Sequence, residues 1–311
     1  MADPRVRLVV NPRAGAGAAG RILPDVVRAL QQRGVTYEIA RTSAPGDATR
    51  IARSSFEDGI DIIAVTGGDG TLNEVAQAYL DDAGQPRPGP EIALLPAGTG
   101  GDLRRTLRLP RDPRQMVDRM CDGTSESIDL GIAELVGWNG EPLTRAFVNV
   151  TSFGVGGATD RLVNQSPKWL GGKAAFFLGT ARALLSYRNA PVRVLVDGSP
   201  FLDGPVFNVA VANGRFFGGG MLIAPDAEPS DGVLEVVALG DLSRPEVIGL
   251  AGRIYRGTHT SHPKVTVTRG KAIEAEPARA GGEVWLDMDG ETPGKLPVRI
   301  RVAPRALRIR T

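Results

Sequence analysis

The sequence predicts two domains, an α/β domain with a mostly parallel sheet followed by a mainly antiparallel β-sandwich. In the first part, short β-branched or aliphatic runs alternate with helical patterns, as they do in parallel α/β layers. From about residue 128, strand-like runs separated by Gly, Pro, Asp and Asn replace that alternation. We therefore expect one domain over residues 1–127 and a second over 128–311, and the sequence leaves open a return of the C-terminal strand to the first domain.

Hydrophobic periodicity places the elements of the first domain. Strands are expected at residues 6–10, 35–40, 60–65 and 92–95, where short aliphatic runs end at turn residues. Helices are expected at residues 22–32, 47–56 and 72–80, where apolar residues recur at helical spacing.

The second domain contains seven runs with strand character. They lie at residues 147–150, 192–196, 207–211, 233–239, 264–268, 284–288 and 298–302. Residues 170–187 differ, because their apolar content and length suit a helix, packed on the sandwich or facing lipid.

Composition narrows the class of protein. The 311 residues include 40 glycines and are 42% hydrophobic, which indicates a globular chain. The 37 basic and 35 acidic residues give a net charge of +2, so nucleic acid is not an expected partner. A single cysteine and the lack of a long apolar stretch predict a cytoplasmic protein with no transmembrane span. The oligomeric state is open, and a homodimer is compatible with the sequence.

Glycine-rich turns follow three of the expected strands, at residues 11–17, 66–71 and 96–102. Glycine brings backbone N–H groups close to a ligand, and a following helix adds its positive end, so such turns suit phosphate. Only five of the 37 basic residues are lysines, the first at Lys168, which excludes a Walker A loop in the first half. Neighbouring turns of this kind form a crevice where open α/β sheets bind ligands.

The acidic residues in these turns suggest a metal ion. Asp69 would repel phosphate directly, but it could face a Mg²⁺ ion that carries phosphate oxygens on its other side. Thr99 can donate to a phosphate oxygen, and Asp102 can hold the metal or orient a group that does. The alternative to a role in binding metal or phosphate is that these three residues belong to ordinary tight turns.

Other candidates are weaker. Arg104, Arg105, Arg108 and Arg111 form either a solvated face or a patch that attracts phosphate or a membrane. His259 and His262 are expected to be loop residues. The aromatic residues Phe153, Phe176, Phe177 and Phe217 are candidates to line an apolar groove for acyl chains.

The motif set resembles the catalytic domain shared by diacylglycerol kinases, sphingosine and ceramide kinases and bacterial lipid kinases. The matching segments are Asn11-Pro12 with Gly15, GGDGTLNE at 67–74, PAGTGGD at 96–102, Asn213-Gly214, APDAEPSDGV at 224–233 and Asp289-Gly290-Glu291. They occur in the family's order over nearly the whole chain. The GGDGT motif alone is shared with NAD kinases and phosphofructokinases.

The resemblance implies an ATP-dependent, Mg²⁺-dependent kinase that phosphorylates a lipid hydroxyl at a membrane surface. It implies that Glu291 accepts the proton of that hydroxyl, with Asp69 as a second catalytic residue. It implies ATP binding by Asn11, Pro12, Arg13, Ala14, Gly15, Thr42, Gly67, Gly68, Asp69, Gly70, Thr71, Leu72, Asn73, Glu74, Thr99 and Asp102. It also implies a structural Mg²⁺ held by Asp231 and the backbone carbonyls of Glu228 and Val233.

The chain departs from the family's pattern at Gly101, where bacterial relatives usually carry Asn. Two other functions stay open, one because the GGDGT motif is shared with NAD kinases and the other because of this change at Gly101. One is a kinase of the NAD kinase type with a water-soluble acceptor, and the other is a regulatory protein that binds ATP or lipid with impaired turnover.

Overall fold

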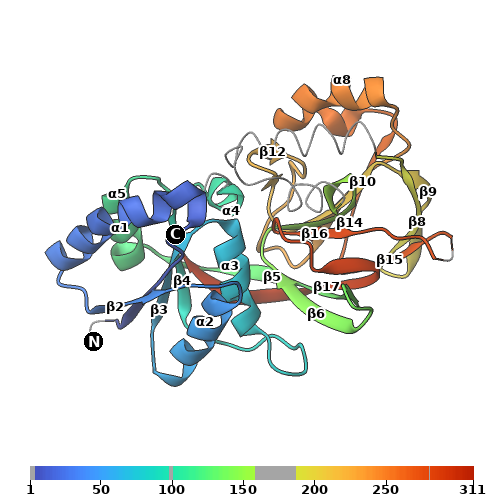
Figure 1. Cartoon of the computed structure of the whole chain (residues 1–311). Coiled ribbons are helices and arrows are strands. Elements are labelled where there is room, and N and C mark those ends of the chain that lie inside the picture. Colours follow the sequence, from blue (N-terminus) through green and yellow to red (C-terminus); the bar gives the residue numbers. More distant parts are fainter. Residues whose placement is uncertain (1–3, 98–100, 158–186, 280) are drawn as a thin grey trace. The chain divides into compact units, whose positions relative to one another are not determined.

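The computed structural model describes residues 4–97, 101–157, 187–279 and 281–311 (Figure 1). The chain divides into two compact units. Unit 1 comprises residues 1–130, 229–231 and 303–311, and unit 2 comprises residues 131–228 and 232–302. Among the described residues, no helix combines the length and apolar character needed to cross a membrane.

Unit 1 is built on a parallel sheet of strands in the order β2 (Tyr37–Arg41), β1 (Val6–Val10), β3 (Ile62–Gly67) and β4 (Glu91–Pro96). Strands β1 and β3 are buried along their full length, as expected when helices cover both faces of a sheet. The last residues of β17 (Gly294–Arg310) join this sheet, because Ile309 and Arg310 pair in parallel with Ile92 and Ala93.

Helices cover both faces of this sheet (Figure 1). The helices α1 (Ala14–Gln32) and α5 (Pro113–Asp122) share a core with alternate residues of the strands, and this core includes Leu30, Ile62 and Met120. On the other face, the buried Arg7 of β1 donates to Ser55 of α2 (Asp47–Glu57) at 3.0 Å. α2 packs against α3 (Asp69–Ala76), which a short 3₁₀ turn, η1 (Gln77–Tyr79), extends. The fifth helix of this unit is α4 (Asp102–Thr106).

Unit 2 is a sandwich of antiparallel strands, as the sequence predicts. One sheet has the order β14 (Val265–Gly270), β13 (Leu234–Leu239), β10 (Asn208–Ala212), β7 (Val150–Gly154) and β16 (Leu286–Met288). The other layer contains β15 (Ala272–Pro277), β8 (Ala190–Val196), β9 (Ser199–Val206) and the first residues of β17. Strand β5 (Ser125–Gly137) and β6 (Pro142–Phe147) form a hairpin. The core between the layers includes Phe147, Phe153 and Leu286.

A second core of unit 2 lies beneath α8 (Arg244–Tyr255), a helix that the sequence analysis does not anticipate. It contains Leu250 and Ile223 and is bordered by the short hairpin β11 (Phe216–Phe217) and β12 (Met221–Leu222). The prediction of a loop at His259 is wrong: this residue lies in a 3₁₀ turn, η3 (His259–Ser261), is fully buried, and its Nε2 is 3.0 Å from the Ile223 carbonyl oxygen. Burial lowers the pKa of this imidazole. The helix expected at residues 170–187 lies almost entirely outside the described residues.

Candidate functional site

The first two glycine turns are joined at the carboxyl ends of β1 and β3. The Asn11 backbone N–H donates to the Thr66 carbonyl at 3.0 Å, and its side-chain Nδ2 donates to Thr71 Oγ1 at 3.2 Å. Thr42 lies at the same edge of the sheet, where its N–H donates to the Val10 carbonyl at 2.9 Å. Asn11, Thr42 and Thr71 therefore all lie at the carboxyl edge of the sheet.

The chain adopts a left-handed conformation in the second part of the first turn. Gly15, Ala16 and Gly17 have φ angles of 59°, 53° and 83° at the start of α1. Glycine adopts such angles without steric cost, whereas Ala16 is strained there. Within the α1 range, helical backbone angles follow only after Gly17, so the continuous part of the helix begins a few residues before the start at residue 22 predicted from periodicity.

The second turn is tightly packed at Gly67. A Cβ at Gly67 would lie 2.5 Å from Thr71 Oγ1, so only glycine fits there. The Gly67 carbonyl accepts the Ala97 N–H at 2.9 Å, and helix α3 begins at Asp69, three residues before the start predicted from periodicity. The N–H groups of the first helical turn of α3 lie at the positive end of the helix dipole, where anions are stabilised.

Asp69 connects the second turn to the third. Its Oδ2 accepts the Gly101 N–H at 2.9 Å, and its Oδ1 accepts the Asp102 N–H at 3.2 Å. The carboxylate therefore holds the start of α4 against the start of α3, a role that the sequence analysis does not foresee. Asp102 itself is 4% exposed and forms an ion pair with Arg105.

Gly101 adopts a left-handed conformation, with φ +65° and ψ +46°, at the N-terminus of α4. Among residues other than glycine, Asn, Asp and His tolerate this region best. The backbone thus explains why Gly can stand where the family pattern has Asn. Arg104 lies beside it, and burial, followed by the charges of Arg111 and Arg105, lowers the pKa of its guanidinium.

Glu74 holds α3 and α2 together, whereas Asn73 bonds along its own helix. Asn73 is 1% exposed and accepts a hydrogen bond from Gln77 Nε2 at 3.2 Å. Glu74 Oε2 accepts the Ala48 N–H at 3.1 Å, and the Thr49 hydroxyl donates to the Glu74 carbonyl at 2.7 Å. The Glu74 side chain therefore links α3 to α2, and Asn73 supports the end of α3.

A cavity of about 20 Å³ lies where the second and third turns meet. This is the space of about one water molecule. It is lined by Val65, Gly67, Gly68, Asp69, Leu72, Leu94, Gly101 and Arg104. The third turn continues through residues 98–100, so Thr99 lies outside the described residues.

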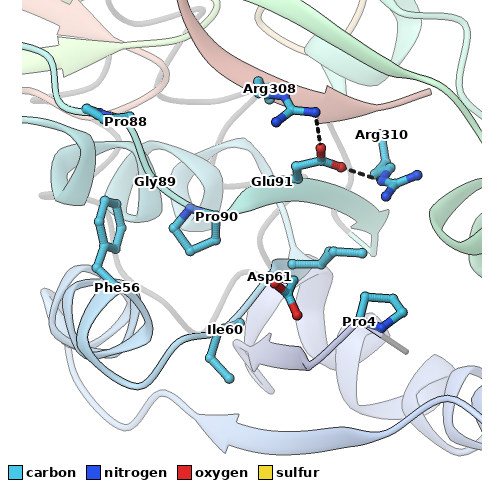
Figure 2. A pocket seen from close by; sticks show the side chains of 11 residues that line it. Pro4, Phe56, Ile60, Asp61, Pro88, Gly89, Pro90, Glu91, Arg308 and Arg310 are labelled. Atoms are coloured by element: carbon cyan, nitrogen blue, oxygen red, sulfur yellow. Dashed lines mark ion pairs between the residues drawn. The ribbon is translucent and has the colours of Figure 1, made fainter. Parts of the chain in front are cut away.

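A much larger cavity, of about 640 Å³, lies at the opposite edge of the unit 1 sheet (Figure 2). Ile62 and Glu91 line it at the amino ends of β3 and β4, and Glu91 is paired with Arg308 and Arg310. None of the predicted nucleotide-binding residues lines this cavity. We assign the candidate site to the carboxyl ends of the strands. The glycine turns, the N-terminus of α3 and the residues Asp69 and Asp102 all lie there.

In unit 2, Glu291 closes a two-residue hairpin. Met288 and Glu291 exchange backbone hydrogen bonds of 2.7 and 3.0 Å across Asp289 and Gly290. These central residues have φ angles of 50° and 88°, the arrangement of a type I′ turn, for which Asp-Gly is a preferred pair. Glu291 is exposed at the end of this turn.

Asp289 fixes the hairpin to the start of β7, which the sequence analysis missed. Its carboxylate accepts three backbone N–H groups, from Val148 at 2.8 Å, Asn149 at 3.1 Å and Val150 at 3.0 Å. The Asp-Gly pair signals the turn, but the partners of the carboxylate are about 140 residues away in sequence.

The residues predicted to hold a structural Mg²⁺ are divided between the units. Asp231 belongs to unit 1, while Glu228 and Val233 belong to unit 2, where Glu228 pairs with Arg215 at 3.3 Å. A carboxylate with two backbone carbonyls is an all-oxygen donor set of the kind that Mg²⁺ accepts. Among the described residues, no group of three or more His, Cys, Asp or Glu side chains is arranged to hold a metal ion.

The aromatic candidates for an acyl groove divide in three. Phe153 is fully buried in the core of the sandwich, so the hypothesis that it lines a groove is wrong. Phe217 is half-buried in β11. Phe176 and Phe177 lie outside the described residues.

Two family models match consecutive parts of the chain. Residues 5–133 match the diacylglycerol kinase catalytic domain, and residues 149–311 match the model described as YegS C-terminal NAD kinase beta sandwich-like domain. A diacylglycerol kinase from Mycobacterium tuberculosis is 31% identical over 310 residues, covering 98% of this chain and 94% of that protein. One from Staphylococcus epidermidis is 29% identical and covers 94% of this chain and 87% of that protein.

Solved structures agree in fold. A putative diacylglycerol kinase from Bacillus anthracis superposes with a TM-score of 0.79 at 24% identity, covering 98% of this chain and 94% of that one. An NAD kinase from Archaeoglobus fulgidus, in complex with ATP, gives a TM-score of 0.51 at 14% identity, covering 99% and 93%. These likenesses support the combination of a parallel α/β unit with a β-sandwich.

Proposed function

This chain belongs to the diacylglycerol kinase catalytic-domain family, a family of kinases, and we propose that it transfers the γ-phosphoryl group of ATP to the hydroxyl of a lipid. The proposed acceptor class is diacylglycerol or a sphingoid or ceramide-type lipid. We further propose that the reaction is Mg²⁺-dependent and takes place at the cytoplasmic surface of a membrane.

The observation that carries the proposal is the link between the glycine turns. Asp69 accepts the N–H groups of Gly101 and Asp102, so the second and third turns are held together at the carboxyl ends of parallel strands. With these turns held in place, other backbone amides of the glycine turns can bind phosphate oxygens without a lysine. This fits a first half that contains no lysine.

In this mechanism, the residues of the turns position the nucleotide. The amides of residues 67–71 bind phosphate oxygens at the N-terminus of α3, and Asn11 fixes the first turn beside them through its bond to Thr71. Mg²⁺, when bound, would neutralise charge on the phosphate oxygens, and Asp69 and Asp102 are the acidic groups of the second and third turns that would support it.

Glu291 is the proposed proton acceptor for the lipid hydroxyl. As a bond forms between the lipid oxygen and the γ-phosphorus, the bond from that phosphorus to the oxygen of ADP breaks, and the hydroxyl proton passes to the Glu291 carboxylate. Positioning matters more than basicity here, because phosphoryl transfer proceeds through a loose transition state. Three hydrogen bonds to Asp289 supply that positioning within unit 2.

An acceptor panel tests the proposal. The purified protein is incubated with γ-labelled ATP and Mg²⁺ and with diacylglycerol, sphingosine, ceramide or NAD, and labelled products are separated. Transfer to a lipid is expected. Transfer to NAD alone would instead support a kinase of the NAD kinase type, and lipid binding without transfer would support a regulatory protein.

A further inference from the structure

Helix α8 presents an uncharged, partly apolar stripe on its outer side. Ile248 is 76% exposed and Tyr255 is 56% exposed, among the most exposed large apolar side chains of the described residues. Positions 248, 251, 252 and 255 follow i, i+3, i+4, i+7 spacing, so Ile248, Ala251, Gly252 and Tyr255 lie along one face of the helix. All four are exposed.

The opposite face of α8 explains why the stripe is turned outward. Leu250 is buried, and Val247 and Ile254 pack with it against the core that contains Ile223. A Cβ added at Gly249, next to Ile248 in the chain, would meet no atom within 4 Å. The helix is therefore already anchored by a complete apolar face, and the outer stripe is not needed for that packing.

Other helices of the protein behave differently at exposed positions. In α2 the exposed residues are Arg50, Arg53 and Glu57, and in α5 they are Arg114, Gln115, Asp118, Arg119 and Asp122. Charged and polar side chains fill the outer faces of those helices, as in ordinary helices that face water. The stripe on α8 departs from this pattern within the same chain.

Basic residues border the stripe. Arg244 lies one turn before Ile248 on the same face, and Arg256 follows Tyr255; both are exposed. Residues 241–264 carry four basic and two acidic side chains. One of the acidic residues, Glu246, is bound by Lys264 Nζ at 2.8 Å and by the Ser243 hydroxyl, and these bonds lower its pKa to about 2.

We propose that the outer face of α8 docks on an anionic lipid surface. Ile248 and Tyr255 would enter the boundary between headgroups and acyl chains, while Arg244 and Arg256 contact anionic headgroups. Apolar side chains flanked by arginines on one helix face suit such a surface, and an aromatic ring with a hydroxyl suits its polar boundary. This inference rests on the proposed function, because a lipid acceptor is what would bring the protein to a membrane.

Vesicle binding tests the proposal directly. The full chain is sedimented with large unilamellar vesicles of phosphatidylglycerol and phosphatidylcholine (1:1) and with vesicles of phosphatidylcholine alone. We expect stronger partitioning to the anionic vesicles, weakened about tenfold by Ile248→Ser, with a smaller loss from Tyr255→Ser. Arg244→Gln and Arg256→Gln should remove much of the preference for phosphatidylglycerol.

The matched control is Val267→Ser, which alters an exposed apolar side chain on β14 and should leave partitioning unchanged. Unaltered vesicle binding by Ile248→Ser would overturn the proposal. So would a self-association, measured by sedimentation velocity, that Ile248→Ser abolishes while vesicle binding persists, since the occupant would then be a second copy of the chain.

A second assay separates this inference from the proposed function. Phosphorylation of dihexanoylglycerol, presented as dissolved monomers, needs no vesicle and should be equal in the wild-type protein and Ile248→Ser. Loss of vesicle binding with retained transfer to this acceptor is the expected result. No transfer by the wild-type protein to any acceptor would refute the kinase proposal, whatever the vesicles show.

Discussion

Asp69 is a single carboxylate with two tasks, one structural and one proposed as catalytic. The structural task follows from its bonds to the N–H groups of Gly101 and Asp102. The sequence indicates that Asp69 belongs to a ligand-binding turn, because its glycine neighbours and the following helix are adjacent in the chain. It could not reveal the partners, which lie in a turn more than 30 residues away.

We predict that Asp69→Ala lowers kcat by about 100-fold or more, because both the fixed third turn and the acidic group near the phosphates are lost. The phosphoryl-transfer rate and the free energy of unfolding should be measured together. Asp112→Ala is the matched control: Asp112 also accepts two backbone N–H groups, from Arg114 and Gln115 at the start of α5. It should lose about 1 kcal/mol of stability and keep its turnover. Wild-type rates in Asp69→Ala would remove Asp69 from the proposed mechanism.

Asp289 is a positioning residue for the Glu291 turn, according to its three backbone hydrogen bonds. Asp289→Asn keeps a residue that tolerates the positive φ but removes acceptor capacity. We expect kcat to fall about 10- to 100-fold, because small displacements of a reacting group are costly, while KM for ATP stays the same. Steady-state kinetics in ATP and lipid distinguish these effects.

Asp197→Asn provides the comparison. Asp197 also has a positive φ, of 49°, and its Oδ1 accepts two backbone N–H groups, from Lys271 at 2.9 Å and Ala272 at 2.8 Å. Both variants should lose about 1–3 kcal/mol of stability. Equal activity losses in the two variants would show that Asp289 acts only through general stability.

At the scale of elements, the parallel strands were the most predictable part of the fold. Their aliphatic runs are buried on both faces, so each run stands out in the sequence. Helix α8 was missed although Ser243 and Glu246 form a capping box at its start. Gly249 and Gly252 weaken its periodic signal, and its outer face lacks the polar residues that define an amphipathic pattern.

A substitution at Gly101, at the start of helix α4, tests whether the departure from the family pattern weakens ATP binding. Gly101→Asn should fold with a stability within about 1 kcal/mol of the wild type, because Asn tolerates the left-handed conformation and its Cβ would lie 3.4 Å from the flexible Arg104 side chain. We expect tighter ATP binding, since the amide adds a donor beside the third turn. Calorimetric titration with ATP measures the change.

Gly46→Asn is the corresponding substitution at the start of α2, where φ is also positive and a Cβ would meet no atom within 4 Å. It should leave ATP binding as it is. If Gly101→Asn also has no effect, the surrounding residues already compensate for the missing side chain.

At the scale of the molecule, unit 1 is assembled from three stretches of the chain. Residues 303–311 supply buried Leu307 and Ile309, and the Arg305 N–H donates to the fully buried Asp129 at 2.7 Å. Sequence patterns locate the strand before residue 302, but its extension to Arg310 depends on pairing with β4, a contact that periodicity does not encode.

We predict that deleting residues 303–311 unfolds unit 1 while the fold of unit 2 is retained. Burial of Leu307 and Ile309 alone contributes about 3–6 kcal/mol, a large share of the stability of a typical domain. Trp138 and Trp285 lie in the described part of unit 2, so their fluorescence reports on that unit, and the third tryptophan, Trp169, lies outside the described residues.

Circular dichroism of the deletion variant should show lost helix with retained native tryptophan emission. Leu296→Ala, at the other end of β17, should instead destabilise the transition seen by tryptophan, because Leu296 lies in the core of unit 2. A deletion variant with the full helical signal would contradict the prediction.

The path of β17 also has a consequence for biosynthesis. A ribosome makes residues 1–130 early, yet the edge of β4 stays unpaired until residues 303–311 have left the exit tunnel. Most of unit 1 is therefore translated long before the strand that completes its sheet. During most of translation its sheet has an open edge, a state in which chaperones and neighbouring nascent chains can bind it.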